Sequence, residues 1–294
     1  AHSCGHDIHT AMLLGAAKLL KQHESELKGA VKLLFQPAEE LLIGCEAAIE
    51  AGIMENPHVD AAFGMHCAAD YPVGTYSSRP EFVMAAVSSF VIDITGKSCH
   101  GGAFIHQGVD PINVGVHIHT ALQEIIAREV KSLEPAVVSV GAFNAGNTCN
   151  TIPATAQMMG TARSYAPEVT ELLDRRIVEI AERTAATFNA AAKVTFLNKV
   201  PSLYNDPELF SMLQEVSADF TDDVRWADRK SLGGDDFAFV TSRVPALFVH
   251  VGAALEDASK RYPLHNPKIV FDENCMKIGI ASHVAMAINW LNRQ

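Results

Sequence analysis

The sequence predicts an α/β fold in which one domain is interrupted by a second. Near both ends of the chain, apolar strand-like runs alternate with segments of helical periodicity, which is typical of a mainly parallel sheet covered by helices. Between residues 86 and 200 the order changes to β-α-β-β-α-β, the split arrangement of ferredoxin-like domains. We therefore predict one domain formed by residues 1–85 and 201–294, and an inserted domain at 86–200.

The first half of the interrupted domain reads as helix, strand, helix and strand. Residues 10–23 repeat apolar side chains at helical spacing. Residues 30–37, AVKLLFQP, are expected to form a short buried strand. Residues 44–52 predict a short helix that ends at a glycine, and residues 60–67, DAAFGMHC, predict a second strand.

The inserted domain is predicted from β-branched alternation and from two long amphipathic patterns. The first of its helices has a proline near its start, where a missing amide hydrogen costs nothing. In order, the predicted elements are a strand at 85–96, a helix at 110–129, strands at 136–143 and 155–165, a helix at 167–190 and a strand at 192–200.

The α/β pattern returns after residue 205. A helix begins at NDPELF, an apolar strand covers 244–253, and a long helix covers 274–291. These elements complete the interrupted domain.

Composition excludes several classes of function. The net charge of −11 argues against nucleic-acid binding, which needs a basic surface. No apolar run reaches the roughly 18 residues of a membrane span, so we expect no membrane partner. Six cysteines in a chain of 294 residues do not resemble a secreted disulfide scaffold. We interpret most of them as buried thiols and expect a cytoplasmic location.

Residues able to bind metals open the chain and recur later. Cys4 and His6 flank Gly5, whose freedom lets both side chains point at one centre. Glu39 and Glu40 follow the predicted strand at 30–37, and one of them could bind a metal while the other takes a proton. In isolation, two adjacent carboxylates more often lie on a solvated loop and bind no metal.

Two single histidines follow further predicted strands. His66 lies at the end of the strand at 60–67, and His265 lies in a loop after the strand at 244–253. A lone histidine is more often a structural hydrogen-bonding group. However, open α/β sheets place their sites where strands end, so one crevice could gather all six residues around two divalent ions.

Seven motifs in a fixed order then carry a family resemblance. They are SCGHDIHTAMLLGAAKLL, LLFQPAEE, GMH, GVDPI, GTARSY, GGDDF and LHNP. Together they resemble the metal-dependent amidohydrolases, which include hippurate hydrolase, auxin-conjugate amidohydrolases and N-acyl-amino-acid deacylases, within the aminoacylase/carboxypeptidase superfamily. The resemblance covers the whole chain. It implies a di-metal catalytic domain interrupted by a smaller lid and dimerisation domain, and hence a homodimer.

The resemblance also implies roles for individual residues. The metal ligands would be Cys4, His6, Glu40, His66 and His265, with Cys4 in the bridging place that an aspartate fills elsewhere. The ions would be Zn or Mn, with Co or Ni possible.

Four further residues take roles outside the ligand set. Glu39 would be the general base, and His100 would reach across a dimer to stabilise the oxyanion. Asn150 would contact the substrate, and Arg163 would bind its carboxylate with a planar, bidentate guanidinium.

The sequence departs from the family pattern at several places. The family carries a further segment before the first motif, so we expect such a segment to be missing here. The lid motif reads GKSCHGGAFIHQG, with one extra residue and Ile105 in place of proline, and GNTCNTIP is one residue shorter than usual. Asp235 replaces the usual glutamate.

We therefore predict metal-dependent hydrolysis of N-acyl amino acids or short peptides. Two alternatives remain open. A thiol amidase would use Cys4 as nucleophile and a neighbouring histidine as base. A catalytically inactive relative would bind metal or ligand without turnover.

Overall fold

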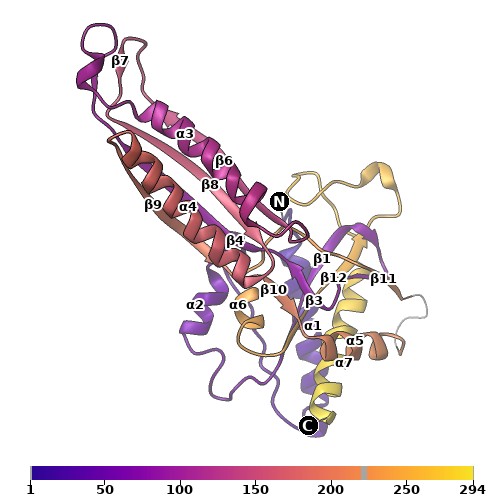
Figure 1. Ribbon diagram of the computed structural model, residues 1–294. Helices are drawn as coiled ribbons and strands as arrows, with labels where there is room; N and C mark the ends of the chain where they lie inside the picture. Colours follow the sequence, from indigo (N-terminus) through magenta and orange to yellow (C-terminus); the bar gives the residue numbers. More distant parts are fainter. Residues whose placement is uncertain (1, 220–223, 294) are drawn as a thin grey trace. The chain divides into compact units, whose positions relative to one another are not determined.

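The computed structural model describes residues 2–219 and 224–293 (Figure 1). The chain divides into two compact units. The first unit comprises Ala1–Val83, Leu203–Ser231 and Asp235–Gln294, and the second comprises Met84–Ser202 and Leu232–Gly234.

The second unit includes the short segment Leu232–Gly234, which lies within the range 201–294 predicted for the interrupted domain. It belongs to the second unit because two hydrogen bonds tie it there. The backbone N–H of Ala85 donates to the Gly233 carbonyl at 3.1 Å, and Nη1 of Arg163 donates to the Leu232 carbonyl at 3.2 Å.

The first unit is built on a mixed four-stranded sheet. Its strands, in spatial order, are β1 (Ala62–Pro72), β12 (Ala246–Ala254), β2 (Thr75–Ser77) and β11 (Arg225–Ala227). β1 and β12 are parallel, as are β2 and β11, whereas β12 and β2 are antiparallel. β12 is buried along its whole length, as expected for a strand covered on both faces. β10 (Leu203–Asn205) and β3 (Glu81–Met84) form a separate two-stranded sheet.

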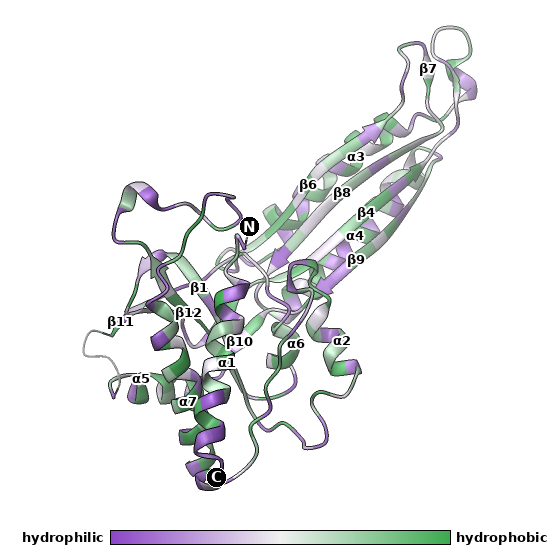
Figure 2. Cartoon of the chain, turned by 180° about the vertical axis from the view of Figure 1, so that it is seen from behind, coloured by the Kyte–Doolittle hydropathy of each residue, from purple (hydrophilic) through white to green (hydrophobic). Residues whose placement is uncertain are grey.

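Helices cover both faces of this sheet. Leu247, Val249 and Val251 pack in one hydrophobic cluster with residues of α1 (His6–Gln22), α5 (Pro207–Ser217) and α7 (Cys275–Arg293). Ala246 points to the opposite face, because successive strand residues alternate. There it packs with residues of α2 (Gly44–Glu50) and α6 (Ala238–Thr241). Figure 2 shows that α1 and α7 carry both hydrophobic and hydrophilic residues, as amphipathic helices do.

The buried strand predicted at 30–37 is wrong. Residues 30–38 have no regular secondary structure and pair with no strand in the described part of the chain. None of these residues is buried, and Phe35 is 48% exposed. An apolar run forms a strand only where a neighbouring strand can satisfy its backbone groups.

The second unit has the predicted β-α-β-β-α-β order. Its elements are β4 (Ala86–Thr95), α3 (Pro111–Glu124), β6 (Ala136–Ala145), β8 (Thr155–Ser164), α4 (Pro167–Thr187) and β9 (Ala191–Val200). The strands lie in the order β6-β8-β4-β9, and all neighbours are antiparallel. The side chain of Asp110 caps α3 by accepting from the Ile112 N–H at 2.9 Å, and α3 continues into a π-helical turn, η4 (Ile125–Glu129).

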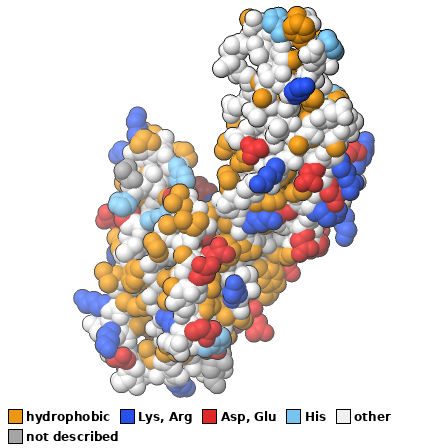
Figure 3. All heavy atoms as spheres, turned by 90° about the vertical axis from the view of Figure 1, so that its left-hand side faces the viewer, with side chains coloured by type: hydrophobic (Ala, Val, Ile, Leu, Met, Phe, Trp, Pro, Cys, Tyr) orange, Lys and Arg blue, Asp and Glu red, His pale blue; other side chains and the backbone are white. Residues whose placement is uncertain are grey.

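Both helices of this unit pack on the same sheet. Buried residues of α3 and α4, such as Ile118 and Leu173, share one hydrophobic cluster with Phe90, Ile92 and Met158 of the strands. At one end of the unit, β5 (Cys99–His100) pairs with β7 (Thr151–Ile152), and the 3₁₀ turn η3 (Ile105–Gln107) lies beside β5. Histidine and hydrophobic side chains gather on the surface at this end (Figure 3), where Phe104 and Ile105 are exposed. No helix among the described residues has the length and apolarity needed to span a membrane.

Candidate metal centre

Gly5 makes the turn that aims Cys4 and His6 at one place. It adopts the left-handed conformation, with φ of 82°, directly before the first residue of α1. A Cβ atom there would lie 3.2 Å from the Phe271 ring and 3.3 Å from the Cβ of Cys67. Only glycine takes this conformation without strain, and the space also leaves little room for a side chain.

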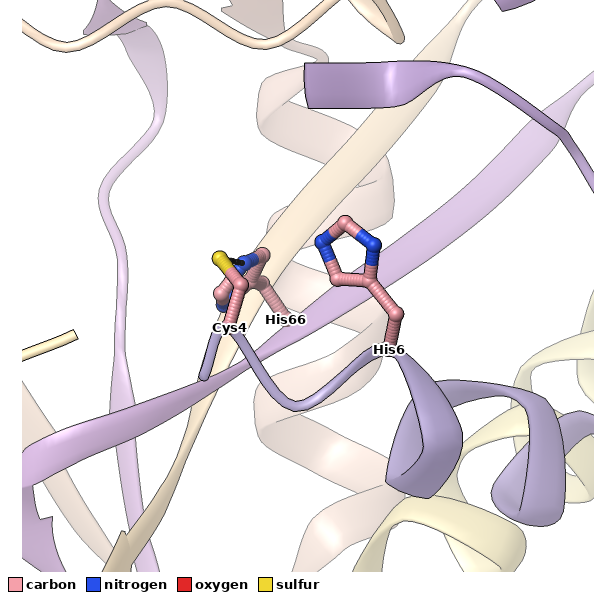
Figure 4. Close-up of side chains that lie close together, drawn as sticks. All are labelled: Cys4, His6 and His66. Atoms are coloured by element: carbon pink, nitrogen blue, oxygen red, sulfur yellow. Dashed lines mark hydrogen bonds between the residues drawn. The ribbon is translucent and has the colours of Figure 1, made fainter. Parts of the chain in front are cut away.

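His66 faces the opening motif from β1. Its Nε2 lies 3.3 Å from the Sγ of Cys4, and the rings of His6 and His66 are 6.1 Å apart (Figure 4). The Nδ1 of His66 lies 2.7 Å from the Cys67 carbonyl, which can only accept. The neutral ring therefore carries its proton on Nδ1 and leaves the Nε2 lone pair directed at Cys4, as in a metal-binding histidine. His66 sits within β1 rather than at its end, because the strand continues to Pro72.

The two glutamates approach from a different segment. Glu39 and Glu40 lie on the 3₁₀ turn η2 (Glu39–Leu41). The sequence predicted them directly after a strand, and that prediction is wrong. The Nε2 of His6 lies 3.4 Å from Oε2 of Glu39 and 3.7 Å from Oε1 of Glu40. The Nε2 of His265 lies 3.5 Å from Oε2 of Glu40. His265 reaches this place from the loop after β12, where its backbone N–H donates to the Ser3 carbonyl at 2.8 Å.

The structure thus brings together all six residues predicted in this unit. Within each of four groups, the candidate ligand atoms lie within 4.8 Å of one another. The groups are Cys4 with His6 and His66, Cys4 with Glu40 and His265, His6 with Glu39 and Glu40, and Glu39 with Asp235 and Asp236. Cys4, His6, Glu39 and Glu40 each belong to two of them, so the groups overlap.

The charges at this place fit a bound cation. Burial, together with the nearby Glu40 carboxylate, raises the pKa of Cys4 to about 12. Burial, with Asp235 and Glu40, raises the pKa of Glu39 to about 8. Both shifts arise because acidic groups are crowded and partly desolvated without an opposing charge. A divalent ion supplies that charge, and sulfur, imidazole and carboxylate together are a donor set typical of Zn²⁺ and its neighbours.

His9 supports this place without joining a ligand group. Its Nε2 accepts a hydrogen bond from the Cys67 N–H at 2.9 Å, and its ring lies 4.4 Å from that of His66. Burial and the neighbouring histidines lower its pKa, so the ring stays neutral. We interpret it as a structural residue.

Sequence reasoning missed Asp236 and His250. Asp236 is fully buried and accepts two hydrogen bonds from the segment that carries the glutamates. His250 is buried on β12 beside His66, with ring centroids 5.6 Å apart. A histidine inside an otherwise apolar strand was the one signal that could have drawn attention to it.

The remaining predicted site residues lie in the second unit. His100 is exposed, and its Nδ1 accepts from the N–H groups of Gly102 and Ala103, each at 3.1 Å. Asn150 is exposed on the neighbouring strand connection, where its carbonyl accepts from the Gly101 N–H at 2.9 Å. Arg163 is half-buried on β8, and burial lowers its pKa.

Comparison with known proteins identifies relatives along the whole chain. Residues 1–289 match the sequence profile of peptidase family M20/M25/M40. The N-acetylcysteine deacetylase of Bacillus subtilis is 35% identical over 287 residues, which cover 98% of this chain and 73% of the relative. The IAA-amino acid hydrolase ILR1-like 4 of Arabidopsis thaliana is also 35% identical, over 99% of this chain and 66% of the relative.

Solved structures agree with the sequence relatives. The Bacillus subtilis YXEP protein, described as a dinuclear metal-binding peptidase from the M20 family, has a TM-score of 0.82 at 33% identity. A putative aminohydrolase from methicillin-resistant Staphylococcus aureus has a TM-score of 0.89 at 26% identity. Each match covers 99% of this chain and 74% of the other chain. The resemblance predicted from the motifs is confirmed: the chain belongs to peptidase family M20/M25/M40 and is a hydrolytic enzyme.

Proposed function

We propose that the chain hydrolyses the amide bond of N-acyl amino acids or short peptides at a centre for two divalent metal ions. The observation that carries the proposal is that Cys4 shares one group of candidate ligand atoms with His6 and His66 and another with Glu40 and His265. Two groups with Cys4 in common would suit two ions. The relatives named as a deacetylase and as an amino acid conjugate hydrolase support amide hydrolysis of small N-acyl compounds.

Five residues would hold the ions. We assign His6 and His66 to one side of Cys4, and Glu40 and His265 to the other, following the two groups of candidate ligand atoms that share Cys4. Zn or Mn suits this mixture of sulfur, nitrogen and oxygen, and Co or Ni is compatible with it. When bound, the ions polarise the amide carbonyl and lower the pKa of an attacking water.

Glu39 is the general base in this proposal. Its carboxylate lies 3.4 Å from Nε2 of His6, beside the proposed ligands, where it can take a proton from water and release it again. Glu39 would take the proton of the attacking water and deliver it to the nitrogen that leaves.

His100 is suited to stabilise the oxyanion. Its Nδ1 accepts two backbone hydrogen bonds, so the proton of the neutral ring lies on Nε2, which is left free to donate. We propose that it does so across a homodimer formed through the second unit. In this scheme the second unit is a ferredoxin-like lid, and its Asn150 and Arg163 contact the substrate.

The location follows from the thiols. All six cysteines are free, which supports a reducing compartment, and we propose the cytoplasm.

The two alternative functions make different demands. A thiol amidase needs a Cys4 thiolate in the absence of metal, yet burial and Glu40 raise the pKa of that thiol to about 12 and keep it protonated. An inactive relative would bind the ions without turnover, and only an assay separates it from the enzyme.

The test is release of free amino acid from N-acetyl, N-benzoyl and N-succinyl amino acids. The purified chain is assayed with added Zn²⁺ or Mn²⁺, and in parallel with a chelator. Turnover that the chelator abolishes supports the proposal. Turnover that is indifferent to the chelator points to Cys4 as nucleophile, and metal binding without turnover across the panel points to the inactive relative.

A further inference from the structure

The segment Gln36–Cys45, termed here the glutamate loop, carries both Glu39 and Glu40. It contains two non-glycine residues in the left-handed conformation, Ala38 with φ of 55° and Leu42 with φ of 57°. Such residues are strained and persist only where the surrounding structure fixes them. Something must therefore hold this loop.

Hydrophobic burial holds this loop only at its C-terminal end. Leu41 and Ile43 are 64% and 50% exposed, and Leu42 is half-buried. At the C-terminal end Gly44 and Cys45 are buried, and Cys45 packs with Val240 and Ala246. There the loop closes on itself so tightly that a Cβ on Gly44 would lie 1.6 Å from the Pro37 carbonyl oxygen.

Asp236 binds both ends of the glutamate loop. Its Oδ1 accepts from Nε2 of Gln36 at 2.6 Å, and its Oδ2 accepts from the backbone N–H of Cys45 at 2.8 Å. The side chain of Asp236 is fully buried, and all three residues belong to the first unit. A buried carboxylate with both oxygens engaged is a strong and directional anchor.

We propose that Asp236 is a positioning residue that holds the glutamate loop closed and thereby sets the places of Glu39 and Glu40. An oxygen of Asp236 lies within 4.8 Å of Glu39, but Gln36 and Cys45 engage both of its oxygens, so in this scheme it acts through these two residues and is not a metal ligand. The inference rests on the proposed function, because it assigns Glu39 as base and Glu40 as ligand.

Three variants test whether Asp236 positions the glutamate loop or only stabilises the folded protein. Asp236→Ala removes both contacts. Asp236→Asn keeps them, because its oxygen accepts from Cys45 while its amide group donates to Gln36 after that side chain flips. Gln36→Leu removes one contact only. Asp206→Ala is the control, since Asp206 also accepts two hydrogen bonds, both from backbone N–H groups, those of Glu208 and Leu209 at 2.9 and 3.0 Å, but caps α5.

The measurements are kcat and KM of the metal-loaded protein, its metal affinity by chelator competition, and hydrogen exchange of peptides covering residues 36–45. Because a misplacement of about 1 Å costs catalysis about 100-fold, Asp236→Ala should lower kcat about 100-fold while KM changes less than about 3-fold. It should also weaken metal binding and speed exchange in the loop. Asp236→Asn should restore most of each property, and Gln36→Leu should fall between them.

The proposal is overturned if Asp236→Ala keeps the wild-type kcat and loop exchange, or if Asp206→Ala lowers kcat equally. It is also overturned if Asp236→Asn is as impaired as Asp236→Ala. If Asp236→Ala does not fold, the comparison of Gln36→Leu with Asp236→Asn tests the proposal by the same three measurements. Gln36→Leu should then be the more impaired of the two. If the wild-type chain hydrolyses nothing, the proposed function fails, while metal affinity and loop exchange still test the anchor.

Discussion

Substituting Gly5 by alanine tests whether the turn between Cys4 and His6 builds the centre. The φ of 82° at Gly5 costs an L-residue roughly 1–2 kcal/mol, and the new Cβ would crowd the Phe271 ring at 3.2 Å. If alanine at position 5 relaxes to an unstrained conformation in the metal-free protein, metal binding must force it back into the left-handed conformation. The binding free energy then loses that roughly 1–2 kcal/mol. Because 1.4 kcal/mol is a factor of ten, metal affinity should fall by about 5–30-fold. Chelator competition measures this affinity directly.

Gly52→Ala is the matched control. Gly52 also lies in the left-handed region, with φ of 89°, but a Cβ there would meet no atom within 4 Å. Both variants should lower the urea midpoint of unfolding of the metal-free protein, whereas only Gly5→Ala should weaken metal binding. If the two variants bind metal equally well, the turn at Gly5 is not what aligns Cys4 with His6.

Three further outcomes are expected from the same structure. Glu39→Gln should lower kcat by at least about 100-fold, because it removes the base, while metal content by elemental analysis stays unchanged; comparable activity would exclude Glu39 as base. The pKa of Glu39 is raised from 4.5 to about 8 in the folded, metal-free protein, so the unfolded state releases this proton first and stability falls as the pH rises between these values. Urea unfolding of Glu39→Gln should therefore match that of the wild type near pH 4 and show a more stable protein at pH 8; a constant difference would contradict the burial of this carboxyl. Cys4→Asp should keep bound metal and chelator-sensitive hydrolysis, because a carboxylate can also bridge, whereas a thiol amidase would lose all turnover.

Local patterns predicted most of the elements because their information is local. The helical spacing of residues 10–23 and the β-branched run at 85–96 correspond to α1 and β4. The run at 30–37 is apolar too, yet forms no strand, because pairing depends on a neighbour that the run itself does not encode.

The centre could be predicted in part for a similar reason. The C-G-H motif contains its own turn, and the structure places His66 and His265 beside it. Asp236 could not be predicted, because its contacts join residues 200 and 191 positions apart and depend on where a loop closes. No periodicity or spacing reports such a hydrogen bond.

A metal titration shows whether Cys4 belongs to a two-ion hydrolytic centre. The metal-depleted chain is titrated with Zn²⁺ or Mn²⁺, and hydrolysis of an N-acetyl amino acid is followed at each addition. We expect no turnover without metal and a rise that saturates at about two ions per chain. Full turnover in the metal-depleted chain would contradict a two-ion centre.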